Sequence, residues 1–174
     1  KMSKSLGNIV EPREVINKYG VDSLRWYFYT VNQPAEPKLF TLKDVEERFR
    51  NFISTLYNTL IFFLTYGDKK IKNTKPHKLN NVLDKWILSK LNNLIKEATL
   101  KLDSYDITGA ARAIEEFVDD LSNWYVRRSR KRFSKSENKK DYQSACQVLG
   151  FVISTLAKLT APFIPFLAEY LYQE

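Results

Sequence analysis

The sequence has only one cysteine, Cys146, and only one histidine, His77. A lone cysteine cannot form an intrachain disulfide, and together these two residues cannot complete the ligand set of a structural zinc site. We therefore predict a protein of the reducing cytoplasm with no metal site of its own. His77 lies in a basic stretch and is expected to be exposed to solvent, whereas Cys146 lies among apolar residues and is expected in the core.

Long apolar runs are also absent. The longest, such as Leu60 to Leu64, fall far short of the roughly 20 residues that a membrane-spanning helix needs. Because the chain starts at Lys1 with no apolar stretch and no initiator Met, we expect no secretory signal, no membrane partner and a longer parent protein.

Glycine is scarce, with five residues in 174, and no segment alternates polar and apolar residues as a half-buried strand would. Basic residues, in contrast, exceed acidic ones by 28 to 20, which gives a formal charge of +8. This charge favours polyanionic partners without naming one, since many basic helical proteins bind none.

Apolar residues recur at helical spacing along most of the chain. Two short helices are expected before residue 32, with Pro12 starting the first, Gly20 ending it and Asp22 capping the second. Four long amphipathic helices should follow at about 41–67, 83–102, 108–133 and 142–159, before Pro162 and Pro165 start a short terminal helix.

These patterns predict an all-α protein. We expect residues 1–40 to hold a polar loop and two short helices, and residues 41–174 to form an antiparallel helical bundle. Thr41 is placed to cap the first long helix, with Asp44 completing a weak capping box. Asp106 or Thr108 is placed to cap the third.

The chain opens with lysines and serines interleaved, as Lys1-Met2-Ser3-Lys4-Ser5-Leu6-Gly7-Asn8. A polar loop ahead of a helix can present ammonium, hydroxyl and backbone N–H groups to a polyphosphate. A solvated tail without a role is the other interpretation of so short a string. The first five letters, however, are identical to KMSKS, the second signature of class I aminoacyl-tRNA synthetases.

Three further segments extend this likeness over the whole chain: residues 18–27 (KYGVDSLRWY), 123–133 (NWYVRRSRKRF) and 161–169 (APFIPFLAE). Together with KMSKS they resemble the isoleucyl-tRNA synthetases, from the KMSKS loop through stem-contact helices into the helical anticodon-binding domain. Leu6-Gly7-Asn8 favours the isoleucyl and valyl branch, and the arginine-rich run favours the isoleucyl one. Val21 and Ser134 depart from the alanine and tryptophan usual there.

The resemblance implies that ATP binds together with Mg and that the carboxylate of isoleucine attacks its α-phosphate. The aminoacyl group is then transferred to tRNA(Ile). It makes Lys4 the catalytic residue that meets the charge shifting to pyrophosphate, with Lys1 assisting. Met2, Ser3 and Ser5 complete the ATP-binding loop. The HIGH signature and the isoleucine pocket would lie in a domain upstream, so the segment is expected to be inactive alone.

A second candidate site is the basic cluster, which comprises Arg127, Arg128, Arg130, Lys131 and Arg132. On a helix turning ~100° per residue, Arg128 and Arg132 fall within about 20° of the apolar stripe centred on Leu121 and should point inward or snorkel. The other three members fall on the flanks and far side and are the better candidates for tRNA phosphates. A helix end whose cations simply complement the dipole is the competing interpretation.

Trp124 and Tyr125 lie on the apolar side of the same helix and are expected in the core rather than as base-stacking platforms. Two other functions stay open. The chain could belong to a valyl enzyme, since nothing in it contacts the amino-acid side chain. It could also be a stand-alone basic bundle that binds RNA or a protein.

Overall fold

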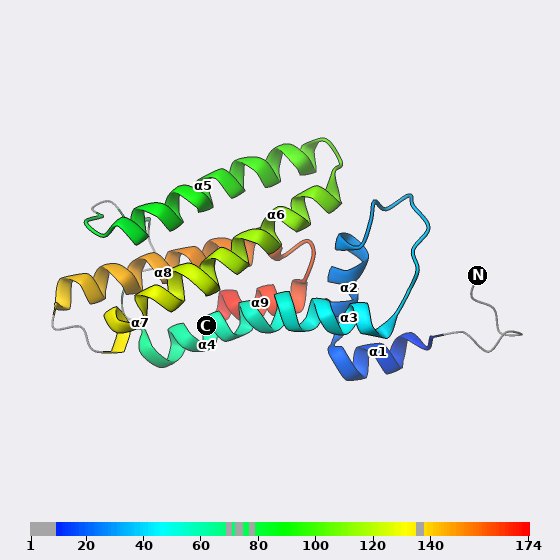
Figure 1. Ribbon diagram of the computed structural model, residues 1–174, viewed down its shortest axis with the longest axis horizontal. Helices are drawn as coiled ribbons and strands as arrows, with labels where there is room; N and C mark the ends of the chain where they lie inside the picture. The colour runs from blue at the N-terminus through cyan, green and yellow to red at the C-terminus, as the bar shows by residue number, and fades with distance from the viewer. Residues whose placement is uncertain (1–9, 69–70, 72–74, 77–78, 135–137) are drawn as a thin grey trace, which may run out of the picture.

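The computed structural model describes residues 10–68, 71, 75–76, 79–134 and 138–174 (Figure 1). Within these ranges the regular structure is entirely helical, so the predicted all-α class is confirmed. The helices are α1 (Pro12–Tyr19), α2 (Val21–Thr30), α3 (Leu42–Arg48), α4 (Ser54–Tyr66), α5 (Val82–Asp103), α6 (Ile107–Asp119), α7 (Arg127–Ser134), α8 (Lys139–Thr160) and α9 (Pro165–Gln173).

Two π-helical segments, η2 (Phe49–Ile53) and η3 (Asp120–Val126), join helices without a break. η2 continues α3 into α4, and η3 continues α6 into α7. The four long helices expected from the sequence are therefore present, two of them with a wide turn near the middle. They lie side by side as an elongated bundle, with α1 and α2 at one end (Figure 1).

Most long helices begin at a local cap. The hydroxyl of Thr41 accepts a hydrogen bond from Asp44 N at 3.1 Å, and the carboxylate of Asp106 accepts one from Gly109 N at 2.9 Å. Asn81 and Asn138 cap α5 and α8 in the same way. These side chains satisfy N–H groups that have no partner within the helix, and two of them, Thr41 and Asp106, are caps expected from the sequence.

The predicted cap at Asp22 is wrong. Gly20 adopts a φ of +79°, so the chain turns within one residue and α2 already begins at Val21. The Asp22 carboxylate instead accepts a hydrogen bond from Leu167 N in α9 at 2.7 Å. Asp22 thus caps a helix that lies at the other end of the sequence.

The buried apolar residues form two clusters. The main cluster fills the bundle between α4, α5, α6 and α8, with fully buried residues such as Leu56, Ile87, Ile114 and Leu149. The small cluster, between α1, α2 and α3, consists of Val15, Tyr19, Tyr27 and Val45.

Helix α2 belongs to both clusters. Trp26 is fully buried in the main cluster and stacks on Phe52 with ring centroids 3.7 Å apart, whereas the neighbouring Tyr27 packs in the small cluster. Arg25 Nε donates to the carbonyl of Phe163 at 2.8 Å, and Arg112 Nη2 donates to that of Thr30 at 2.9 Å. The packing is therefore continuous across residue 40, where we predict the division into two units.

None of the described helices combines the length and the hydropathy required to cross a membrane.

Candidate nucleic-acid interface

The expected ATP-facing residues, Lys1, Met2, Ser3, Lys4 and Ser5, lie outside the described residues, and so does His77. The described chain begins just before α1, whose N-terminus carries Glu11 at the cap position and Pro12 at the first helical position. The roles assigned to the lysines and serines remain predictions.

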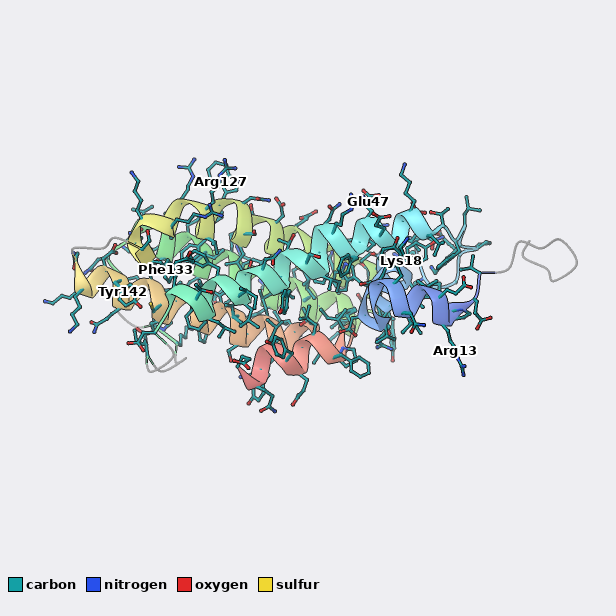
Figure 2. All side chains as sticks on the ribbon, turned by 90° about the horizontal axis from the view of Figure 1, so that it is seen from below. Arg13, Lys18, Glu47, Arg127, Phe133 and Tyr142 are labelled. Atoms are coloured by element: carbon teal, nitrogen blue, oxygen red, sulfur yellow. The ribbon has the colours of Figure 1, made fainter. Side chains whose placement is uncertain are left out.

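The basic cluster lies on α7, at the end of the long helix formed by α6, η3 and α7. Four of its members, Arg127, Arg128, Arg130 and Lys131, are exposed. Figure 2 shows Arg127 pointing away from the bundle. Arg132 is different, because its side chain is only 10% exposed. Of the two residues predicted to point inward or to snorkel, Arg132 points inward, whereas Arg128 is exposed and does not.

The π-helical turn explains the difference. In η3 the backbone hydrogen bonds span five residues rather than four, so the helix needs one extra residue to come back to the same face. Leu121, Tyr125, Ser129 and Phe133 therefore lie in turn on the buried face, and Val126 is buried as well. Ser129 occupies the inward position at which a regular helix would have placed Arg128.

The same turn moves Trp124 to the surface. Its side chain is 50% exposed, which corrects the expectation that it lies in the core. The guanidinium carbon of Arg128 lies 4.3 Å from the centroid of the indole ring, within the range of a cation–π contact. Tyr125, in contrast, is fully buried, as expected.

Arg132 is held by a buried polar network that sequence reasoning missed. Its Nη1 and Nη2 donate to the two carboxylate oxygens of Asp84 at 2.7 and 2.8 Å, and its Nε donates to Asp141 at 2.9 Å. Asp84 is fully buried and also accepts hydrogen bonds from the Tyr125 hydroxyl at 2.8 Å and the Ser144 hydroxyl at 2.9 Å. The network ties α7 to α5 and α8, so the backbone that carries the exposed cations is held in place.

The protonation states in this network follow from its partners. Burial alone would lower the pKa of Arg132, but its hydrogen bonds to Asp84 and Asp141 outweigh burial and raise the pKa. Burial, followed by the nearby charge of Asp84, raises the pKa of Tyr125 well above its ordinary value. The arginine therefore stays charged and the phenol stays neutral, which keeps the buried carboxylate compensated.

A signal for Asp84 was present in the sequence. It is one turn ahead of Leu88 and three residues before Ile87, both of which are buried in α5. A carboxylate on the apolar face of a helix needs a cationic partner, because burying an unpaired charge is very unfavourable. Its partner could not be predicted, since Arg132 lies 48 residues away.

Charge changes sign along the α6–η3–α7 helix. An open cavity beside α6 and η3 is lined by two arginines, Arg48 and Arg112, and four carboxylates, Glu115, Glu116, Asp119 and Asp120. Arg48 is paired with Glu115 at 3.2 Å. Anions are thus disfavoured at the α6 end, whereas the exposed cations of α7 favour them.

Among the described residues, no group of three His, Cys, Asp or Glu side chains is arranged to hold a metal ion. Cys146 is 1% exposed, as expected of a core residue, and burial raises the pKa of its thiol. A buried, neutral thiol is a poor nucleophile.

The sequence from residue 84 to residue 174, which contains the network and the basic cluster, matches the family described as the anticodon-binding domain of tRNA ligases. The chain belongs to this family. Residues 1–39 match a second family, the class I tRNA synthetases for I, L, M and V. The first match covers α5 to α9, and the class I match covers the KMSKS motif, α1 and α2.

Several curated relatives are named isoleucine–tRNA ligase. The chain is 50% identical to isoleucine–tRNA ligase of Dehalococcoides mccartyi, 49% to that of Clostridium tetani and 42% to that of Thermus thermophilus. Each match covers 99% of the chain but only 17% of the relative. The chain therefore spans about a sixth of the length of the curated relatives it matches.

Solved structures share the fold. Methionyl-tRNA synthetase of Mycobacterium tuberculosis bound by methionyl-adenylate matches with a TM-score of 0.80 and 22% identity, over 98% of this chain and 35% of that one. A leucyl enzyme of Agrobacterium radiobacter, in a ternary complex with tRNA, matches with a TM-score of 0.68 and 21% identity, over 99% of this chain and 20% of that one.

Proposed function

We propose that the chain is a segment of an isoleucine–tRNA ligase, which activates isoleucine with ATP and transfers it to tRNA(Ile). The observation that supports this best is the 42% to 50% identity to ligases of that name over 99% of the chain. Such identity covers both the KMSKS motif and the helical bundle. It favours isoleucine over valine, although the residues that would contact the amino acid lie elsewhere in the relatives.

In this proposal the bundle holds the tRNA by its phosphates. Arg127, Arg130 and Lys131 are exposed on one helix, and among the described residues none of their side chains is paired with a carboxylate. Unpaired cations on a rigid helix bind phosphates without reading sequence. Arg132 contributes indirectly, because its guanidinium is already bound by Asp84 and Asp141.

The N-terminal loop would serve ATP, which enters with Mg as a substrate. Lys4 would neutralise the charge that develops on the leaving pyrophosphate, and Lys1 would assist it. Met2, Ser3 and Ser5 would complete the loop around the nucleotide. A flexible ammonium group suits a position at which charge moves during the reaction.

Isoleucine-dependent exchange of pyrophosphate into ATP, catalysed by the longer protein that carries this segment, tests the proposal. We expect exchange with isoleucine to exceed exchange with valine by about 100-fold, since one methylene is worth about 1–3 kcal/mol in an apolar pocket. Lys4→Ala should lower kcat much more than it raises the KM for isoleucine, because its contact strengthens in the transition state. Preference for valine would refute the isoleucine assignment, and an equal effect on kcat and KM would refute the role of Lys4.

A further inference from the structure

Trp124 differs from the other two tryptophans of the chain. Trp26 is fully buried, and Trp86 is partly buried against the main cluster, but half of the Trp124 side chain is exposed. Indole gains more from burial than most side chains, so a half-exposed one on a rigid helix retains a large apolar surface available to a ligand.

Arg128 gives this surface a positive charge. Its guanidinium lies over the indole at 4.3 Å from the centroid, and no described carboxylate forms an ion pair with it. The comparable pair on α5 differs on both points: Lys90 lies 5.9 Å from the Trp86 ring and is paired with Asp120 at 2.8 Å. Of these two tryptophan pairs, only Trp124 and Arg128 combine a close contact with a cation that forms no ion pair with a described carboxylate.

We propose that Trp124 and Arg128 form a stacking site for an unpaired RNA base, with Arg127, Arg130 and Lys131 binding the neighbouring phosphates. This inference rests on the proposed tRNA-binding function and deepens it, because it names the residues that would stack on a base of the RNA. Unpaired bases stack on aromatic rings and on guanidinium planes, whereas bases inside a duplex are already stacked on each other. The ligand is thus a loop nucleotide rather than a helical stem.

The charges around the site define how the RNA approaches. Asp120 lies one turn before Trp124, and Glu116 and Asp119 line the acidic cavity beyond it. The exposed cations all lie on the other side of Trp124, within the next two turns. The phosphates that flank the stacked base therefore follow α7 and avoid α6.

The alternative is that Arg128 only shields the indole from water. In that case the pair would contribute to stability and not to RNA binding. The two roles are separable because stacking on a base changes the emission of the indole, whereas shielding by a neighbouring side chain does not depend on RNA.

The test compares Trp124→Ala and Trp124→Phe in the intact protein, titrated with the tRNA(Ile) transcript. Loss of one stacked base weakens binding by about 5-fold to 140-fold, which we expect for Trp124→Ala. Trp124→Phe retains a ring and should bind within about 3-fold of the wild type, yet it should lose most of the RNA-induced quenching of tryptophan fluorescence. Trp86→Phe is the matched control and should leave that quenching in place.

Salt dependence separates the stacked base from the phosphate contacts. Trp124→Ala should leave the slope of log affinity against log salt unchanged, whereas the Arg127→Ala, Arg130→Ala double variant should reduce it by about 2, or about 1 per lost contact. Arg13→Ala is a control, since Figure 2 shows Arg13 on α1 pointing to the opposite side from Arg127.

Wild-type affinity in Trp124→Ala, or undiminished quenching in Trp124→Phe, would overturn the stacking site even if the arginine variant weakens binding as expected. If the arginine variant also binds like the wild type, the tRNA-binding role of α7 fails as well. Circular dichroism of each variant identifies any loss of affinity that comes from misfolding.

Discussion

At the scale of single residues, Asp84 is the polar group on which the basic helix most depends. It is fully buried and accepts hydrogen bonds from Arg132, Tyr125 and Ser144, which lie on three different segments. These hydrogen bonds compensate the cost of burying the carboxylate charge, but without the carboxylate each donor would lose a hydrogen-bond acceptor.

Asp84→Ala should lower the free energy of unfolding by about 3–5 kcal/mol, because it leaves Arg132 as a buried cation with one partner fewer. Urea denaturation followed by far-UV circular dichroism measures the change. Asp141→Asn is the matched control: Asp141 also bonds Arg132, but its side chain is 30% exposed. Water can replace part of its interaction, so we expect a cost of about 1 kcal/mol or less. Equal costs for the two variants would contradict the central place of Asp84.

At the same scale, the sequence shows that Trp124 is aromatic and Arg128 is cationic, but not the direction in which either side chain points. That direction depends on whether the helix is regular. One extra residue in the turn at η3 changed which side chain faces the core, and propensities do not predict a π-helical turn.

At the scale of elements, α9 depends on a side chain from α2. Its N-cap position is Ile164, which has no polar group to offer, and Pro165 follows at the first helical position. Asp22 supplies the missing acceptor for Leu167 N. The cap therefore forms only when α2 and α9 are already packed together.

The Asp22 carboxyl is partly buried, and burial raises its pKa more than its bonds from the Leu167 and Phe166 N–H groups and the charge of Arg25 lower it. Between the unfolded pKa of about 3.8 and the raised folded value, the folded state keeps a proton that the unfolded state has released. Stability contributed by this group is thus greatest at acid pH and falls as pH rises through that window.

Asp22→Asn keeps an acceptor oxygen for Leu167 N but cannot titrate. We expect its stability, relative to the wild type, to increase from pH 3.5 to pH 7, measured by urea denaturation at matched ionic strength. Asp22→Ala removes the acceptor and should cost about 1 kcal/mol at pH 7, as other lost helix caps do. Parallel pH curves for Asp22→Asn and the wild type would show that the pKa of Asp22 is not raised.

At the scale of the whole molecule, α2 packs in both apolar clusters, and we expect it to join them into one folding unit. Trp26 and Tyr27 are adjacent in sequence and are both fully buried, one in each cluster. Disrupting the small cluster should therefore also destabilise the bundle, because α2 cannot leave one cluster without disturbing the other.

Val15→Ala, in the small cluster, tests this coupling. It should cost about 1–2 kcal/mol, since each buried methylene is worth about 0.8 kcal/mol. All three tryptophans lie outside the small cluster, so tryptophan fluorescence reports on the bundle, whereas far-UV circular dichroism reports on every helix. We expect both probes to shift together to the same lower midpoint. A shift seen only by circular dichroism would mean that α1 to α3 unfold independently.

The sequence by itself determined the helical class, the positions of the long helices and the residues that relate the chain to its family. Helix periodicity and caps such as Thr41 and Asp106 are local, because each rests on residues within a turn or two of one another. The same holds for the basic cluster, whose members are neighbours in the chain.

Only the tertiary structure decided which of these residues face outward and what the buried polar groups bind. Asp84 meets Arg132 and Asp22 meets Leu167 across 48 and 145 residues, distances over which no local pattern carries information. The exposure of Trp124 depends on the π-helical turn, which lets η3 and α7 keep Leu121, Tyr125, Ser129 and Phe133 against the core. Contacts between distant segments thus decided which side chains of η3 and α7 are exposed.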